Sequence, residues 1–195
     1  MAAERPLRVL ALGDSLTAGW GLPAGAAFPV QLQRALVAEG RAVTVLDGGV
    51  SGDTSAGGRA RLDWALGGHP DVVIVELGAN DGLRGADPAE LYANLDAILT
   101  RLDRAGLPVL LAGMRAPPNY GKDYAERFAA VYSRLARVHK VVFYPFFLDG
   151  VAGRPGLNQG DGMHPTAQGV AEIVRRILPA VTQILDRAEA RGAAP

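Results

Sequence analysis

The chain has 195 residues, with 20 basic and 20 acidic side chains, and its zero formal charge argues against a nucleic-acid partner attracted by bulk charge. No run of about 18 apolar residues occurs, so we expect no integral membrane segment. The absence of cysteine excludes disulfides and a cysteine nucleophile. The length predicts one domain over residues 1–195, with a frayed tail over about 187–195.

The N-terminus, Met1 to Pro6, is short, carries Glu4 and Arg5, and does not resemble a signal peptide. We therefore expect a cytoplasmic protein, or a periplasmic or secreted one where a leader has been removed. A monomer is expected.

Short β-branched or apolar runs recur along the chain and predict five strands. They are Leu7–Leu12, Ala42–Leu46, Val72–Leu77, Val109–Ala112 and Val141–Phe146. Apolar residues at helical spacing lie between and after these runs, within 28–36, 62–66, 91–102, 124–138 and 170–185. Asp87-Pro88 predicts a helix start and Gly106 a helix end. Pro179 predicts a kink or break in the last helix.

Alternation of strands and helices predicts βαβ units, a parallel sheet and helices on both of its faces. The expected fold is a three-layer α/β/α sandwich with five parallel strands. For five strands the order 2-1-3-4-5 is one common solution, with a crevice between strands 1 and 3. Ser15 and the loop after Leu77 would meet in that crevice.

Ser15 follows the first predicted strand at an abrupt Gly13-Asp14-Ser15 turn, which makes it a candidate nucleophile. A serine hydroxyl needs a base, an orienting group for that base and donors for the developing oxyanion. Ser51, in a glycine-rich cluster after the second strand, is the rival nucleophile. We favour Ser15 because it has the better strand-end setting.

His164 is the one histidine expected at the same end of the sheet as Ser15, because His69 and His139 precede strands. Asp161, three residues earlier, can reach its other ring nitrogen and fix its tautomer. These residues predict a Ser15, His164 and Asp161 triad.

Three donors could form an oxyanion hole: the backbone N–H groups of Ser15 and Gly52, and the side-chain amide of Asn80. Taken singly, a glycine-rich turn, an Asn-Asp-Gly turn and an Asp-x-x-His pair have ordinary structural explanations. Taken together, they supply every part of one acyl-transfer site.

These residues form four blocks that resemble the SGNH (GDSL) hydrolase family and follow one another in that family's order. The blocks are Gly13-Asp14-Ser15-Leu16, Ser51-Gly52-Asp53-Thr54, Gly78-Ala79-Asn80-Asp81 and Asp161-Gly162-Met163-His164-Pro165. The stretches Val75–Gly85 and Pro118–Gly121 are similar to the bacterial thioesterase I, lysophospholipase and arylesterase group. The resemblance implies a flavodoxin-like sandwich with no metal or cofactor, acting on esters and thioesters of medium or long acyl chains.

Two features separate the chain from related patterns. Thr17 stands where the Gly-x-Ser-x-Gly elbow of α/β-hydrolases needs its second glycine, and here acid and base share one loop. Ala116 stands where the resembled group has a larger aliphatic residue beside the acyl groove.

The loops after strands 3, 4 and 5 are expected to wall a shallow acyl groove. The substrate contacts that we predict are Asp14, Leu83, Ala116, Pro117, Tyr120 and Leu157.

The predicted function is a serine esterase/thioesterase that hydrolyses small-molecule carboxylic esters and acyl thioesters through an acyl-enzyme. Its expected substrates are aryl esters, medium- to long-chain acyl esters and lysophospholipids. One alternative is a carbohydrate O-acetylesterase with the same catalytic parts. The other is a non-catalytic flavodoxin-like ligand-binding module, which would leave Asn80 and the Asp161–His164 pair unexplained.

Overall fold

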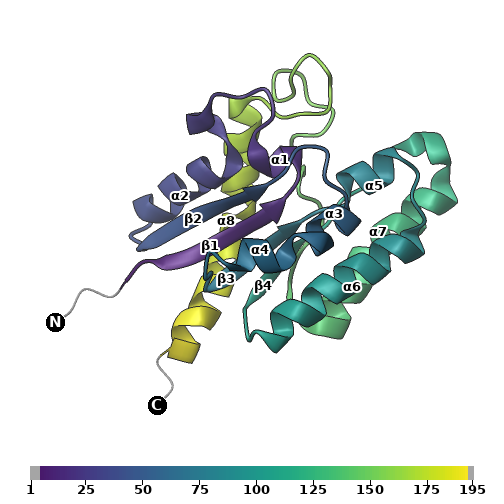
Figure 1. Ribbon diagram of the computed structural model, residues 1–195. Coiled ribbons are helices and arrows are strands. Elements are labelled where there is room, and N and C mark those ends of the chain that lie inside the picture. The colour runs from purple at the N-terminus through teal and green to yellow at the C-terminus, as the bar shows by residue number, and fades with distance from the viewer. Residues whose placement is uncertain (1–4, 193–195) are drawn as a thin grey trace.

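A computed structural model describes residues 5–192, and its centre is a five-stranded parallel sheet (Figure 1). The strands are β1 (Leu7–Gly13), β2 (Val43–Gly49), β3 (Val72–Glu76), β4 (Val109–Ala112) and β5 (Val142–Tyr144). Their order is β2-β1-β3-β4-β5, which confirms the predicted order. Strand β2 extends three residues beyond its predicted end, whereas β5 is shorter than predicted.

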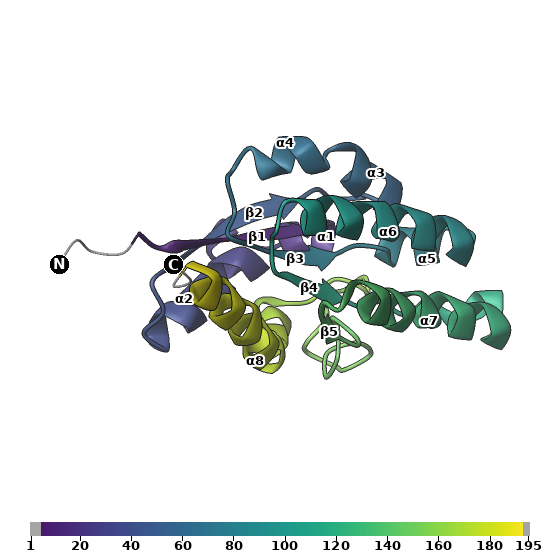
Figure 2. The ribbon, with the colours of Figure 1, turned by 90° about the horizontal axis from the view of Figure 1, so that it is seen from below.

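Helices cover both faces of the sheet, as Figure 2 shows from below. On one face lie α2 (Phe28–Ala38) and α8 (Ala167–Gly192), which contact each other. The other face carries α3 (Ser55–Ala60), α4 (Leu62–Leu66) and α6 (Pro88–Arg104), with α7 (Lys122–His139) packed beside α6. Short elements follow strand ends or lie in loops: α1 (Ser15–Ala18), α5 (Ala79–Leu83) and the 3-10 turns η1 (Ala24–Ala26) and η2 (Pro118–Tyr120).

The register of the central strands decides where the functional loops emerge. Gly13, the last residue of β1, pairs with Gly49 of β2 and with Glu76 of β3. The three chains therefore leave the sheet at the same level and next to one another. Since β3 is buried along its whole length, the loops meet above a well-packed part of the sheet.

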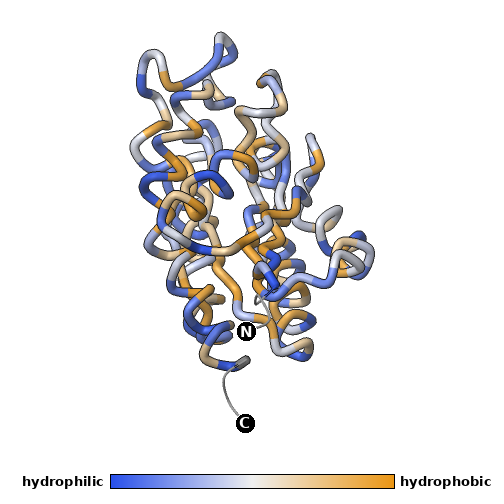
Figure 3. The backbone as a smooth tube through the Cα atoms, turned by 90° about the vertical axis from the view of Figure 1, so that its left-hand side faces the viewer, coloured by the Kyte–Doolittle hydropathy of each residue, from blue (hydrophilic) through white to orange (hydrophobic). Residues whose placement is uncertain are grey.

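Local sequence signals determine the ends of α6. The Asp87 side chain accepts a hydrogen bond from the Ala89 N–H at 2.9 Å, Pro88 occupies the first helical position, and Gly106 follows the helix with φ +69°. The expected start and end are confirmed. Figure 3 shows orange and blue alternating along the helices, as one apolar face per helix requires.

Helix α8 runs through Pro179 to Gly192 without a break, so of the kink or break expected at this proline the break does not occur. Ile177 and Val181 are buried on either side of Pro179, as are Ile184 and Leu185 further on, so packing holds the helix across the proline. Beyond that point Arg41 forms ion pairs with Asp186 and Glu189. The tail predicted to fray is thus helical over 187–192, and 193–195 lie outside the described residues. No helix within residues 5–192 has the length and apolar character needed to span a membrane.

Candidate active site

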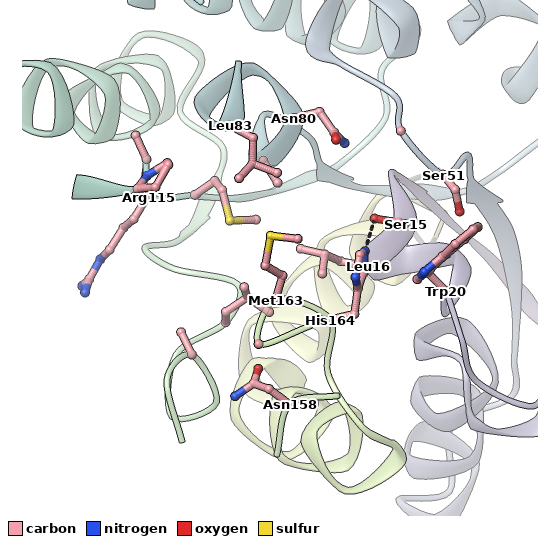
Figure 4. Close-up of a pocket in the computed structure, with 18 of the residues that line it drawn as sticks. Ser15, Leu16, Trp20, Ser51, Asn80, Leu83, Arg115, Asn158, Met163 and His164 are labelled. Carbon is pink, nitrogen blue, oxygen red and sulfur yellow. Dashed lines mark hydrogen bonds between the residues drawn. The ribbon is translucent and has the colours of Figure 1, made fainter. Parts of the chain in front are cut away.

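Ser15, His164 and Asp161 form a continuous chain of hydrogen-bonding groups. The Ser15 Oγ lies 3.0 Å from His164 Nε2 (Figure 4), and His164 Nδ1 lies 2.6 Å from Asp161 Oδ2. The other oxygen of Asp161 accepts the backbone N–H groups of Met163 and His164. The hydrogen bond with the His164 side chain, reinforced by these N–H groups, lowers the pKa of Asp161 to about 2. The carboxylate is therefore ionised at any ordinary working pH.

The turn that presents Ser15 requires small residues and a cap. A Cβ on Gly13 would lie 2.0 Å from Thr17 Oγ1, so no larger residue fits there. Asp14 caps α1 by accepting the Leu16 N–H at 2.9 Å. Ser15 is consequently the first residue of α1, and its own N–H has no partner within the helix.

Two buried carboxyl groups lie beneath this turn. Thr17 Oγ1 donates to Glu76 Oε2 at 2.8 Å, and the Asp14 N–H approaches the same oxygen at 3.4 Å. Burial raises the pKa of Asp14 to about 6, against the opposing effect of its bond with Leu16. Burial, and then the nearby Asp14, raise the pKa of Glu76 well above its ordinary value. Both carboxyl groups therefore hold their protons to a higher pH than ordinary exposed carboxyl groups do.

Gly52 and Asn80 approach Ser15 from the loops after β2 and β3. Gly52 has φ +83°, a conformation that favours glycine, and a Cβ there would meet only open space. Gly78, with φ +116°, makes the turn into the short helix that carries Asn80. The Asn80 amide nitrogen lies 2.8 Å from the Asp53 carbonyl oxygen and 3.3 Å from Asp14 Oδ2.

Arg61 joins the two loops that flank the nucleophile. Its Nε donates to Asp53 Oδ2 at 2.6 Å and its Nη2 donates to the Gly13 carbonyl at 2.8 Å. The same guanidinium therefore fixes the residue before Asp14 and the residue after Gly52. Arg84 adds a bond of 3.2 Å to the Gly52 carbonyl. These contacts tie the Gly52 loop to the turn that precedes Ser15.

A cavity of about 610 Å³ opens beside Ser15 and His164. Apolar side chains make up most of its wall, and Leu83, Ala116 and Pro117 are among them, as the sequence predicted. The further lining residues are Leu16, Trp20, Ser51, Gly52, Ala79, Asn80, Met114, Arg115, Phe146, Leu148, Ala152, Asn158, Gly162 and Met163.

Three predicted substrate contacts lie outside this lining. Asp14 is buried beneath Ser15 as a helix cap. The Tyr120 hydroxyl donates to the Leu83 carbonyl at 3.0 Å, so this side chain supports the wall instead of forming it. Leu157 packs against the hydrophobic core. These residues do not line the cavity, and a loop's sequence does not say which side chains turn inward.

Sequence reasoning missed Leu16, Trp20, Phe146 and Met163 as lining residues. Trp20 and Met163 carried a usable sequence signal, because each is a large apolar residue in or beside a catalytic block. The structure shows both side chains exposed. Phe146 carried none, since it lay inside a predicted strand that ends earlier than expected.

The other two histidines lie away from this cluster, as expected. The His139 Nε2 lies 2.8 Å from Asp96 Oδ1 near the end of α7, and His69 follows α4, before β3. Within the described part of the chain, no three His, Cys, Asp or Glu side chains are placed to hold a metal ion.

Comparison with known proteins agrees with this geometry. Residues 11–171 match the GDSL-like lipase/acylhydrolase family. An arylesterase of Vibrio mimicus is 41% identical over 181 residues, which are 91% of this chain and 90% of that protein. The thioesterase 1/protease 1/lysophospholipase L1 of Escherichia coli (strain K12) is 42% identical over 158 residues, which are 80% of this chain and 74% of that protein.

Among solved structures, AlinE4, an SGNH-hydrolase family esterase, aligns with a TM-score of 0.79 at 45% identity, over 94% of this chain and 99% of that one. The fold, the order of the four blocks and these similarities lead to one conclusion: the chain belongs to the GDSL-like lipase/acylhydrolase family.

Proposed function

We propose that this chain is a serine esterase and thioesterase that hydrolyses carboxylic esters and acyl thioesters through an acyl-enzyme. The observation that carries the proposal is the chain of hydrogen-bonding groups from Ser15 through His164 to Asp161, set at the mouth of an apolar cavity. We also propose that it acts as a monomer, because one chain supplies all the catalytic groups.

In the first step His164 Nε2 takes the Ser15 proton while Oγ bonds to the substrate carbonyl carbon. Asp161 holds the ring in the tautomer that leaves Nε2 free, and it stabilises the imidazolium that forms. The 3.0 Å separation of Oγ and Nε2 is short enough for direct proton transfer.

The tetrahedral intermediate places a negative charge on the former carbonyl oxygen. The N–H groups of Ser15 and Gly52 and the Asn80 amide are its donors in this proposal. Asn80 keeps one amide proton on the Asp53 carbonyl, and the other is held only by the longer contact with Asp14. This second proton is the one that the proposal assigns to the oxyanion.

The intermediate collapses when the carbon–oxygen or carbon–sulfur bond breaks and His164 returns its proton to the departing alcohol or thiol. Water, deprotonated by the same histidine, then attacks the acyl-Ser15 ester. Ser15 regains its proton and the carboxylic acid leaves.

The apolar wall supports acyl chains longer than acetyl. Met114, Ala116, Phe146 and Leu148 offer contacts to a hydrocarbon chain. The relatives' names include arylesterase, thioesterase and lysophospholipase, and we carry all three substrate types over to this chain as candidates. A carbohydrate O-acetylesterase would leave most of this apolar surface without a role.

A p-nitrophenyl ester series from acetyl to palmitoyl, run beside an acyl-coenzyme A, tests the proposal. We expect hydrolysis of both substrate types, with medium or long chains preferred over acetyl. Activity confined to acetyl esters would favour the O-acetylesterase. Cleavage of neither substrate type would contradict the proposal.

A further inference from the structure

Trp20 is a large apolar side chain that stands exposed beside the catalytic pair. It is 58% exposed and lines the cavity, with its ring centroid 6.3 Å from that of His164 and tilted by 41°. Figure 4 shows Trp20 and Ser51 on one side of the Ser15–His164 bond, and Leu83, Met163 and Arg115 on the other. The cavity therefore has two unequal sides.

The backbone fixes the position of Trp20 relative to both catalytic groups. Its N–H donates to the Ser15 carbonyl at 3.1 Å, and its own carbonyl accepts the Gln159 side-chain amide at 2.7 Å. The Gln159 backbone N–H donates to the His164 carbonyl at 2.7 Å. Gly19 and Gly21, with φ +76° and +74°, form the tight bend that directs this residue outwards. The ring is thus exposed on a rigid support.

The proposed reaction determines which half of the substrate must lie on this side. His164 Nε2 delivers its proton to the oxygen or sulfur of the leaving group, so that atom must come within hydrogen-bond distance of Nε2. The group attached to it then lies against the neighbouring Trp20 ring. The acyl chain then lies against the opposite and larger apolar side of the cavity.

We propose that Trp20 is a specificity-determining residue that binds the leaving group, and that it favours aromatic leaving groups by stacking. Two aromatic rings in contact gain more than their buried area alone provides. Among residues 5–192, Trp20 has no aromatic partner apart from the tilted imidazole of His164. This inference rests on the proposed function and names the preferred substrates: aryl esters over alkyl esters of the same acid.

Phenyl butyrate and ethyl butyrate test the assignment, because they share an acyl group and differ only in what leaves. We expect Trp20→Ala to lower the ratio of their kcat/KM values by roughly three- to tenfold, and Trp20→Phe to retain most of it. Trp64, on α4, is 80% exposed and lies outside the cavity, so Trp64→Ala is the matched control and should leave the ratio unchanged.

A second measurement separates binding of the leaving group from general damage. Both esters give the same butyryl-enzyme, from which the leaving group has gone, so hydrolysis of that intermediate in single-turnover experiments should be unchanged in Trp20→Ala. An unchanged ratio, or equal losses in acylation and deacylation, would overturn the assignment. Wild-type protein that cleaves neither ester would instead overturn the proposed function.

Discussion

The floor of the active site, beneath Ser15, and the wall of its cavity are built in different ways. Beneath and beside Ser15, the side chains of Asp14, Glu76, Asn80 and Arg61 are joined by hydrogen bonds to each other or to neighbouring backbone. Across the cavity, the wall consists mainly of apolar side chains from loops. A hydrogen bond fixes distance and direction, whereas apolar contact fixes neither.

This difference separates the two tasks of the enzyme. The floor sets the geometry on which the chemistry depends, so removing a group there that acts on the reacting atoms should alter rates by orders of magnitude. The wall selects among substrates, so changes there should alter ratios and leave the chemistry intact.

Ser15→Ala should have the largest effect. It removes the nucleophile, and loss of a comparable serine in a serine protease costs about 10⁶ in kcat. The measurement is p-nitrophenyl ester hydrolysis beside a melting curve, which should change little. Ser51→Ala is the matched control and should keep a substantial fraction of activity. The reverse ranking of these two variants would refute the assignment of the nucleophile.

Asn80→Ala should come next, with a loss in kcat of roughly 10²–10³ and a smaller change in KM. The amide serves the oxyanion, which exists only in the transition state and the intermediate, so substrate binding suffers less. Asn80→Asp should be at least as damaging, since it adds a carboxylate beside Asp14. A kcat near normal in the Asp variant would remove Asn80 from the oxyanion hole.

Ala116→Leu tests the wall. The larger side chain fills part of the cavity, so we expect the ratio of palmitoyl to butyryl ester hydrolysis to fall by roughly tenfold, with butyryl kcat nearly unchanged. The ester series measures this directly. A constant ratio would place the acyl chain elsewhere in the cavity.

Glu76→Gln should give the smallest effect, which appears in stability. Because burial raises the pKa of Glu76 and Asp14, the folded state holds protons that the unfolded chain releases, and stability falls as pH rises above the ordinary carboxyl range. For Asp14 this decline runs from about 4 to about 6. Glutamine cannot ionise, so it removes the Glu76 contribution.

The melting temperature of Glu76→Gln relative to wild type should therefore be higher at pH 8 than at pH 5. About 1 kcal/mol moves the melting temperature by roughly 2–4 °C in a protein of this size, so a shift of a few degrees is measurable. A difference between the two proteins that does not depend on pH would show that Glu76 folds without a raised pKa.

The sequence alone predicted the sheet order and brought Ser15, His164 and Asp161 to one edge, because parallel strands deliver their following loops to the same side. The wall was harder to predict. Whether Trp20 or Tyr120 faces the cavity depends on glycine turns and on single hydrogen bonds such as that from Tyr120 to Leu83. The break considered at Pro179 does not occur for a similar reason, since burial of the helix on both sides of it outweighs the local cost of proline.

The most direct test of the central claim is labelling with a fluorophosphonate, followed by intact mass and peptide mapping. A serine activated by a histidine reacts with such a probe, whereas an ordinary surface serine does not. We predict one label per chain, located on Ser15, and none in Ser15→Ala. A label on Ser51, or an unlabelled wild-type protein that is folded, would contradict the account.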